Sequence, residues 1–206
     1  MCLSVFDWAH FRRQKGAVKL HLVLDHDVCL PVFAHITDGK THEVKMAQRL
    51  TLPRGAVVAM DRGYNDYVLF NEWCLGGVFF VTRMKDNAVY EAIDKPRESS
   101  HPSIRKDEQI VLMGAGAEEK CPHILRRVVV WDEQNQRELV LLTNHLKFAA
   151  STIAAVYKEG WQIELFFKAL KQNLRVKTFV GTSANALKIQ IWTALIALLQ
   201  LKMLQF

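Results

Sequence analysis

Alternating apolar and polar residues near the start of the chain predict a hairpin followed by a short helix. Lys19–Leu24 and Cys29–Ile36 each alternate as a half-buried strand does. The intervening Asp25-His26-Asp27 has the composition of a tight turn, so the two strands are expected to pair. Residues 41–50 open with Thr-His-Glu, which favours the first turn of a helix.

The next stretch predicts two parallel strands joined by a helix. Ala56–Met60 is a short, continuous apolar run, which is typical of a strand covered on both faces. Asn65 suits an N-cap, and a helix is expected from there through Trp73. The pair Gly76-Gly77 ends this helix, and Val78–Thr82 is again an apolar strand. Strand, helix and strand in this order indicate a parallel α/β unit.

The second half of the chain changes from strand-like to helical periodicity. Residues 86–143 are expected to be β-rich, with a loop near 92–106. Short strands are expected at Gln109–Met113, Arg126–Trp131 and Glu138–Thr143. From Ser151 the apolar positions recur at helical spacing, which predicts one helix over 151–174 and another over 185–204.

Positive charge is concentrated at the C-terminal end of the 206 residues. Residues 151–206 hold 7 basic and 2 acidic side chains, whereas residues 86–150 hold 9 and 11. A concentrated basic region favours an anionic partner such as nucleic acid. The four cysteines form no CxxC pair, which argues against zinc and suits a reducing cytoplasm. The most apolar stretch, Ile189–Leu199, is too short to span a bilayer, so no membrane partner is expected.

Asp61 is the first candidate for a catalytic or metal-binding residue, because it directly follows the apolar strand Ala56–Met60. In open α/β sheets, side chains at the carboxyl ends of strands converge on ligands. Taken alone, Asp61 could equally cap the turn before the next helix.

A second acidic residue lies on the polar face of the helix predicted over 151–174. Spacings of three and four place six side chains on that face: Tyr157, Trp161, Glu164, Lys168, Lys171 and Arg175. The acid and the lysines could form only a surface ion-pair ladder, worth roughly 0.2–0.5 kcal/mol per pair. However, aromatic residues before the acid and cations after it suit phosphodiester chemistry. The carboxylate would hold a metal ion while the cations position phosphates.

The segment YKEGWQIELFFKALKQNL closely resembles the signature helix of DDE transposases of the IS4 family of insertion sequences. That signature is Tyr, two residues, Arg, three residues, Glu, six residues and Lys, and Tyr157, Glu164 and Lys171 match it. The segment MDRGYNDYVLFNEW resembles the family's second-Asp segment, which places that Asp at Asp61. LSVFDWAHFRRQKGAVKLHLVLDHD and KTFVGTSANALKIQIWTALIALL are also similar to this family, so the resemblance covers nearly the whole chain.

The resemblance implies an α/β fold with an RNase H-like catalytic core. Residues 1–85 would form the N-terminal part of the core, 86–143 a β-rich insertion and 144–206 the C-terminal helices. It also implies a two-metal Mg²⁺ site that cleaves double-stranded DNA at transposon ends and joins it to a target. Transposases of this type act on paired ends, so a homodimer is expected.

The resemblance also implies roles for individual residues. Asp61 and Glu164 would be catalytic and would bind the metal. The DNA-binding residues would be Tyr157, Trp161, Lys168, Lys171 and Arg175. Among these, Tyr157 and Lys171 match the signature and would contact the DNA end. That Trp161 stacks on a displaced base is a hypothesis from its position beside the motif.

Two positions depart from the family pattern. Gly160 replaces the signature Arg, which removes a phosphate-binding cation and would cost about 1 kcal/mol inside a helix. The family's first catalytic Asp lies on a strand before the segment matching Leu3–Phe6, so this first core strand is expected to be missing. Asp7 in a loop-like stretch and Asp25 and Asp27 in a turn are not expected to replace that Asp. Loss of a central strand would leave backbone groups unpaired, so the chain alone is expected to be unstable and inactive.

Three functions remain open on the sequence. The leading hypothesis is a transposase catalytic-domain fragment, from a truncated or frameshifted element, for metal-dependent cleavage and strand transfer. The alternative is a non-catalytic remnant that binds DNA or a full-length transposase. A nuclease of the same fold is a third, because one metal site serves both hydrolysis and transfer. The Tyr–Glu–Lys signature favours the transposase.

Overall fold

The computed structural model describes residues 2–7, 18–38, 41–93, 95–97, 99, 101–114, 116–160, 162–173 and 184–204. Within these residues, nine strands form one mixed sheet in the order β3-β2-β1-β4-β5-β9-β8-β7-β6. They are β1 (Cys2–Asp7), β2 (Val18–Leu24), β3 (Pro31–Asp38), β4 (Val57–Met60), β5 (Phe79–Arg83), β6 (Val89–Ala92), β7 (Ile104–Met113), β8 (Leu125–Asp132) and β9 (Arg137–Thr143). β4 is parallel to both of its neighbours, β1 and β5, and the other adjacent pairs are antiparallel.

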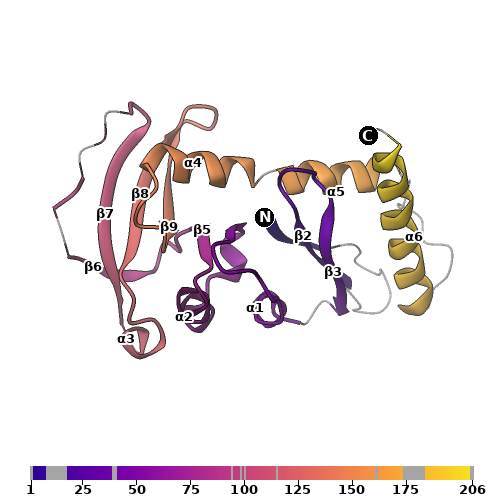
Figure 1. The fold of residues 1–206 in the computed structure, drawn as a ribbon, viewed down its shortest axis with the longest axis horizontal. Coiled ribbons are helices and arrows are strands. Elements are labelled where there is room, and N and C mark those ends of the chain that lie inside the picture. Colours follow the sequence, from indigo (N-terminus) through magenta and orange to yellow (C-terminus); the bar gives the residue numbers. More distant parts are fainter. Residues whose placement is uncertain are drawn as a thin grey trace.

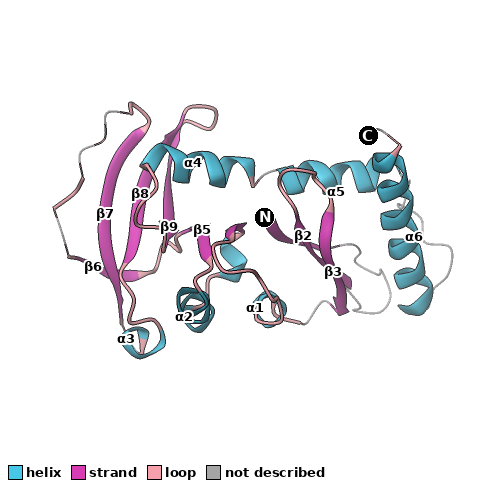
Figure 2. Ribbon diagram, in the orientation of Figure 1, coloured by secondary structure: helices cyan, strands magenta, loops and turns pink. Residues whose placement is uncertain are grey.

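Helices cover the sheet in two layers (Figure 1). They are α1 (Glu43–Ala47), the 3-10 turn η1 (Arg62–Tyr64), α2 (Tyr67–Gly76), α3 (Ala117–Lys120), α4 (Ala150–Glu159), α5 (Gln162–Asn173) and α6 (Ala184–Met203). α1, α2 and α3 lie on one face, and α4 and α5 lie on the other, with the strands between them (Figure 2). α6 stands beside α5 at the β3 end of the sheet (Figure 1). This mixed α/β arrangement is consistent with the expected RNase H-like core.

β4 is covered on both faces, as its continuous apolar run predicts. Val58 and Met60 belong to the buried cluster that includes Phe70 of α2. Val57 and Ala59 belong instead to the two clusters on the side of α4 and α5. This alternation follows from the two-residue period of a strand, and it fixes which side of the sheet faces each helix layer.

The prediction that the first core strand is missing is wrong. β1 lies between β2 and β4, where it pairs with β2 from Cys2↔Leu24 to Asp7↔Lys19. It also pairs in parallel with β4 through Leu3↔Met60. The expected unpaired backbone groups do not arise there, because the extended run at the start of the chain supplies the hydrogen bonds. Asp7 is the last residue of this strand and does not lie in a loop.

The single helix predicted over 151–174 is two helices. α4 ends at Glu159 and α5 begins at Gln162. Gly160 forms the C-cap of α4, and its N–H donates to the carbonyl of Val156 at 3.1 Å. The amphipathic pattern runs through the break, and for this reason the periodicity alone did not reveal it. The second predicted helix, 185–204, is confirmed as α6.

Two details of the α/β unit differ from expectation. α2 is capped by Asp66, whose carboxylate accepts a hydrogen bond from the N–H of Leu69 at 3.0 Å, and not by Asn65. The Asn65 side chain instead donates to the carbonyl of Arg83 at 2.7 Å and accepts from the hydroxyl of Thr82 at 2.8 Å. Asn65 therefore links the start of α2 to the end of β5.

The strands of the predicted insertion continue the same sheet. β5 pairs antiparallel with β9 at Val81↔Thr143, and β8, β7 and β6 follow outward. β7 begins at Ile104, five residues before the predicted strand, and the sequence did not indicate β6 or α3. In the described part of the chain, no helix has the length and apolar character needed to cross a membrane.

Candidate functional site

Asp61 lies at the carboxyl end of β4, in a central position of the sheet. Its backbone is extended, with φ −66° and ψ 154°, and its side chain is exposed. The carboxylate makes no capping hydrogen bond to the turn that follows, so Asp61 does not have the alternative role of a side-chain turn cap. It also makes no hydrogen bond or ion pair with any residue that the structure describes. Because side chains alternate along extended backbone, Asp61 continues the Val57–Ala59 side of β4, which is the side of α4 and α5.

A buried polar network around Tyr64 lies on the α1–α2 side of the sheet, within range of the charge of Asp61. The hydroxyl of Tyr64 is 3.5 Å from Nδ1 of His21, and Nε2 of that histidine is 2.9 Å from the hydroxyl of Thr37. Both Tyr64 and His21 have exposed fractions of 0%. Burial, followed by the negative charges of Glu43 and Asp61, raises the pKa of Tyr64 far above its ordinary value. The tyrosine therefore remains a neutral O–H group.

Two cations lie near Asp61 at the same edge of the sheet. Arg62 forms an ion pair with Asp86 at 2.9 Å, and Nζ of Lys85 donates to the carbonyl of Asn65 at 2.8 Å. These side chains line an open cavity of about 460 Å³, together with Gly63 and Asn87. The loops after the parallel strands β4 and β5 meet here, as expected for the ligand-binding edge of such a sheet.

Glu164 is exposed on the first turn of α5. Four apolar residues of this helix are buried in one cluster with Ala59 of β4: Ile163, Phe166, Phe167 and Leu170. Within the described residues, Glu164 and Lys168 form no ion pair, so this part of the surface-ladder alternative is not formed. The apolar residues fix α5 on the sheet and leave the Glu164 carboxylate available to a ligand.

Gly160 brings the helix junction into close contact with β4. A Cβ atom placed on Gly160 would lie 2.9 Å from the Cβ of Ala59. Ala59 precedes Asp61 by two residues on the same side of the strand, and Gly160 precedes Glu164, in the first turn of α5, by four residues. The contact therefore joins the segments that carry the two candidate ligands.

Tyr157 of the signature lines a second cavity. This cavity has a volume of about 580 Å³ and lies between α4 and the β8–β9 hairpin, with Trp131, His101 and Lys158 also in its wall. Tyr157 is half-buried and packs in the apolar cluster that contains Ile153. The ring is thus held by the packing of α4 and not displayed on a free surface.

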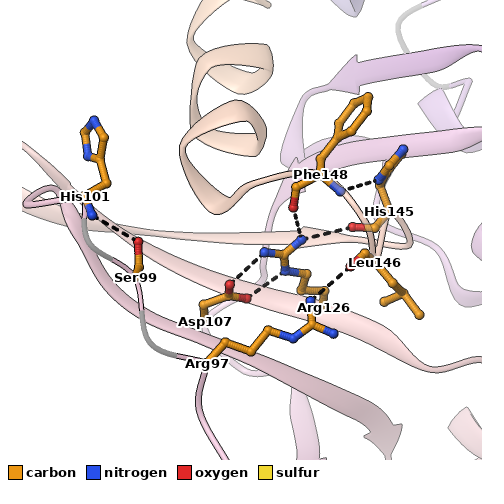
Figure 3. Close-up of polar contacts among 8 residues, drawn as sticks. All are labelled: Arg97, Ser99, His101, Asp107, Arg126, His145, Leu146 and Phe148. Atoms are coloured by element: carbon orange, nitrogen blue, oxygen red, sulfur yellow. Dashed lines mark hydrogen bonds and ion pairs between the residues drawn. The ribbon is translucent and has the colours of Figure 1, made fainter.

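A buried ion pair holds the segment that leads into α4 (Figure 3). Arg126 of β8 donates to Asp107 of β7 through Nε and Nη2, both at 2.7 Å. Its Nη1 donates to the carbonyls of His145 and Phe148, in the loop between β9 and α4. On the surface, Arg97 donates to the carbonyl of Leu146 in the same loop. Strands β7 and β8 therefore hold the loop that leads into α4.

His145 is part of this anchor as a neutral ring. Burial, together with the nearby charges of Arg126 and Lys147, lowers its pKa. Its Nδ1 accepts a hydrogen bond from the N–H of Phe148 at 3.1 Å, which requires that nitrogen to be unprotonated. The ring stacks on Phe148 with a centroid distance of 3.6 Å and also contacts Phe79 of β5.

The structure places some of the predicted site residues and not others. Asp61 and Glu164 belong to facing parts of the sheet and the α4–α5 layer, and Lys168 is exposed on α5. Trp161, Arg175 and the side chain of Lys171 lie outside the described residues. Within the described part of the chain, no three His, Cys, Asp or Glu side chains gather as a ready metal-binding group.

Sequence reasoning missed the buried polar residues that support the site. Arg126 and Asp107 lie at inward positions of two neighbouring strands, with exposed fractions of 2% and 4%. A charged residue at an inward position of a β-rich segment was the available signal, because such a residue must find a partner. His21 occupies the same kind of position in β2, between the buried Leu20 and Leu22.

Comparison with known proteins agrees with this geometry. Residues 5–200 match the family described as "Transposase DDE domain". The chain is 32% identical to a putative transposase, y4zB, of Sinorhizobium fredii, over 92% of this chain and 54% of that protein. It is 31% identical to a probable transposase for insertion sequence element IS5377 of Geobacillus stearothermophilus, over 96% of this chain and 52% of that protein.

A further relative extends the likeness to IS4 itself. The transposase InsG for insertion sequence element IS4 of Escherichia coli is 24% identical, over 77% of this chain and 37% of that protein. The chain spans about half the length of the first two relatives. The family match covers most of the chain, and two of these three relatives are transposases for insertion sequence elements. The chain therefore belongs to the DDE transposase family, in its IS4 group.

Proposed function

We propose that Asp61 and Glu164 supply two ligands of a divalent-metal site that acts on DNA at transposon ends. The observation that carries this proposal is the exposed Asp61 carboxylate. It has no partner among the described residues, and it lies at the end of β4 on the side covered by the signature helices. In the transposase family, such a site belongs to DNA transposition. We further propose that this chain by itself binds DNA and metal but does not transfer strands.

The donor chemistry of these residues fits Mg²⁺. Magnesium prefers oxygen ligands, keeps several waters, and is commonly held by one or two carboxylates together with substrate phosphates. Bound there, it would activate an attacking oxygen and stabilise the leaving one. Two protein carboxylates without a third are compatible with this mode if DNA phosphates complete the coordination.

The remaining residues of the site suit DNA positioning. Arg62 and Lys85 bring two cations to the edge of the sheet beside Asp61, where they would hold backbone phosphates. Lys168, exposed on α5, extends the basic contact surface, and Tyr157 lines the cavity beside α4.

The register of β1 supports the proposed lack of strand transfer. Leu3 pairs with Met60, so the next residue, Ser4, occupies the register position beside Asp61. A two-metal site needs a third carboxylate, and β1 offers a serine at this level. The alternative function, a non-catalytic remnant that binds DNA or a full-length transposase, draws on the same observation.

The proposal is tested by measuring Mn²⁺ binding and DNA binding of the purified chain and its variants. Asp61→Asn and Glu164→Gln should each weaken Mn²⁺ binding and remove metal-stimulated binding to a duplex that carries a transposon end. Glu119→Gln, on exposed α3, is the matched control and should change neither. Ser4→Asp should strengthen Mn²⁺ binding, because it places a carboxylate at the register position beside Asp61.

The outcomes separate the candidate functions. Metal-independent DNA binding that is identical in all variants would support the non-catalytic remnant and contradict the metal site. Mg²⁺-dependent strand transfer by the unaltered chain would contradict the proposed lack of transfer. Phosphodiester hydrolysis without joining would identify a nuclease of the same fold.

A further inference from the structure

We infer that Gly160 is a positioning residue for Glu164, and that a side chain at this position, including the Arg of the family signature, weakens metal binding in this chain. This inference rests on the proposed metal site. It reverses the expectation from sequence alone, where the missing Arg is a simple loss of a cation.

The backbone conformation of Gly160 does not require glycine. Its φ of −53° and ψ of −22° lie in the right-handed helical region, which every residue adopts. The freedom that makes glycine special at turns is therefore not used here. What excludes a side chain is chiefly the neighbouring strand, and a Cβ would also lie 3.0 Å from the carbonyl oxygen of Tyr157.

The exclusion is steric and local. A Cβ on Gly160 would lie 2.9 Å from the Cβ of Ala59, well inside the roughly 3.5–4.0 Å at which carbon atoms make favourable contact. Ala59 has no rotatable side chain with which to give way, and it is only 5% exposed. The helix junction, the strand or both must move by about 0.6 Å or more to accept even a methyl group.

The junction is also held from the side by the β2–β3 turn. His26 Nε2 lies 2.8 Å from a carboxylate oxygen of Glu159, but the two groups are not aligned as a hydrogen bond. The contact is an ion pair when the ring is protonated. The thiol of Cys29 donates to Oε1 of Gln162 at 2.9 Å. The carbonyl of Cys29 in turn accepts from Nζ of Lys202 on α6 at 3.0 Å. Glu159 and Gln162, on either side of Gly160, are thus both held by the β2–β3 turn, so the junction cannot move away from Ala59 without breaking these contacts.

Both candidate ligands are within a short reach of this contact. Asp61 follows Ala59 by two residues, about 6.6 Å along an extended strand, and Glu164 lies in the first turn of α5, four residues after Gly160. Metal ligands must be held to within about 0.5 Å of their productive positions. A displacement forced at the Gly160–Ala59 contact is therefore of the size that a metal site does not tolerate.

The test is a double-mutant cycle read out by Mn²⁺ affinity. The variants are Gly160→Ala, Ala59→Gly and the pair together, with Gly160→Arg as the restored signature. Electron paramagnetic resonance measures free Mn²⁺ over each protein, and circular dichroism establishes that each is folded. Gly76→Ala is the control, because a Cβ there meets nothing within 4 Å and the residue lies in the opposite helix layer.

Gly160→Ala and Gly160→Arg should raise the Mn²⁺ dissociation constant at least about tenfold, the size seen when groups that orient metal ligands are lost. The double variant should return to within about twofold of Ala59→Gly, because removing the Ala59 methyl makes room for the new one. Hydrogen exchange of α5 amides should accelerate in Gly160→Ala and recover in the double variant. Gly76→Ala should bind Mn²⁺ as the parent does.

Two failures are distinguishable. If Asp61→Asn binds Mn²⁺ as well as the parent does, the proposed metal site is wrong, and Glu164 is not a metal ligand that Gly160 could position. If Asp61→Asn loses binding while Gly160→Arg binds as well as the parent or better, the metal site stands and this inference is overturned. Should Gly160→Ala not fold, the double variant must restore folding, and its failure to do so would also overturn the inference.

Discussion

Replacing Arg126 by Met removes the buried contacts that join β7 and β8 to the loop that leads into α4. In the folded protein this side chain is 2% exposed and donates two parallel hydrogen bonds to the carboxylate of Asp107, which is 5% exposed. It also donates to the carbonyls of His145 and Phe148. The Met side chain fills a similar length but donates nothing, so one carboxylate and two carbonyls lose their partner at once.

The expected loss of stability follows from which groups remain buried. Breaking a buried ion pair by removing one partner costs about 3–5 kcal/mol, mainly because the remaining charge is left uncompensated. Replacing both partners with apolar residues of similar volume is often neutral. Asp107→Leu combined with Arg126→Met should therefore destabilise less than Arg126→Met alone. It should not recover fully, because the two loop carbonyls still lack a donor, at about 1–3 kcal/mol for each one that stays buried.

Urea denaturation, followed by tryptophan fluorescence and circular dichroism, measures the free energy of unfolding of each variant. Arg97→Met is the control, because this arginine also donates to a carbonyl of the same loop, that of Leu146, but on the exposed surface. It should change stability by no more than about 0.5 kcal/mol. A loss below about 1 kcal/mol in Arg126→Met, or a double variant less stable than that single one, would refute the reasoning.

Three further outcomes are expected. Asp66→Ala should lower the free energy of unfolding by about 1 kcal/mol in urea titrations, because α2 loses its N-cap acceptor; no change would contradict the cap. Burial alone would raise the pKa of Glu43, but the hydrogen bond that its carboxylate accepts from Lys19 lowers this pKa below the ordinary 4.5. The ion pair therefore stabilises the folded protein at neutral pH, and this stabilisation is lost as pH falls through the lowered pKa. Lys19→Met should shrink the difference in stability between pH 7 and pH 3 by up to about 1 kcal/mol, and an unchanged difference would exclude the ion pair as its source. Burial raises the pKa of Cys121 to about 11, so iodoacetamide at pH 8 should modify this thiol in urea but not in the folded protein. Mass spectrometry of the peptide measures the modification, and rapid modification without urea would contradict the burial of Cys121.

The elements with a strong local pattern were predictable from the sequence. The run Ala56–Met60 is apolar throughout because both of its faces are covered, and this property located β4 and placed Asp61 at its end. The alternation of residues 19–24 and 29–36 likewise gave the β2–β3 hairpin. In these segments the local pattern and the tertiary burial agree, so periodicity alone was sufficient.

β1 and the helix break could not be read in this way. The place of Cys2–Asp7 between β2 and β4 depends on pairing with strands that follow it in the sequence. At Gly160 the helical period continues across the break, and the facing residue, Ala59, lies about a hundred positions earlier. In both places periodicity was insufficient, because the partner segment is distant in the sequence.

The N-cap of α2 shows a different limit. Asn65 and Asp66 are both good cap residues, so the local chemistry permits either. The choice is made by Thr82 and the carbonyl of Arg83 on β5, which take the Asn65 side chain. Once that side chain is committed to the sheet, Asp66 is left to accept from the N–H of Leu69.

The two candidate ligands are supported by unlike means, and this bears on how the site could evolve. Asp61 follows a strand held on both faces by apolar packing, which tolerates many substitutions that keep volume and polarity. Glu164 depends instead on a helix junction fixed by the contact of Gly160 with Ala59 and, through α4, by the buried Arg126. Polar and close-packed contacts of this kind fail when a single partner changes. Changes at Gly160 and Ala59 are therefore expected to occur together, so that the residue at the signature Arg position has to be interpreted with the residue on the facing strand.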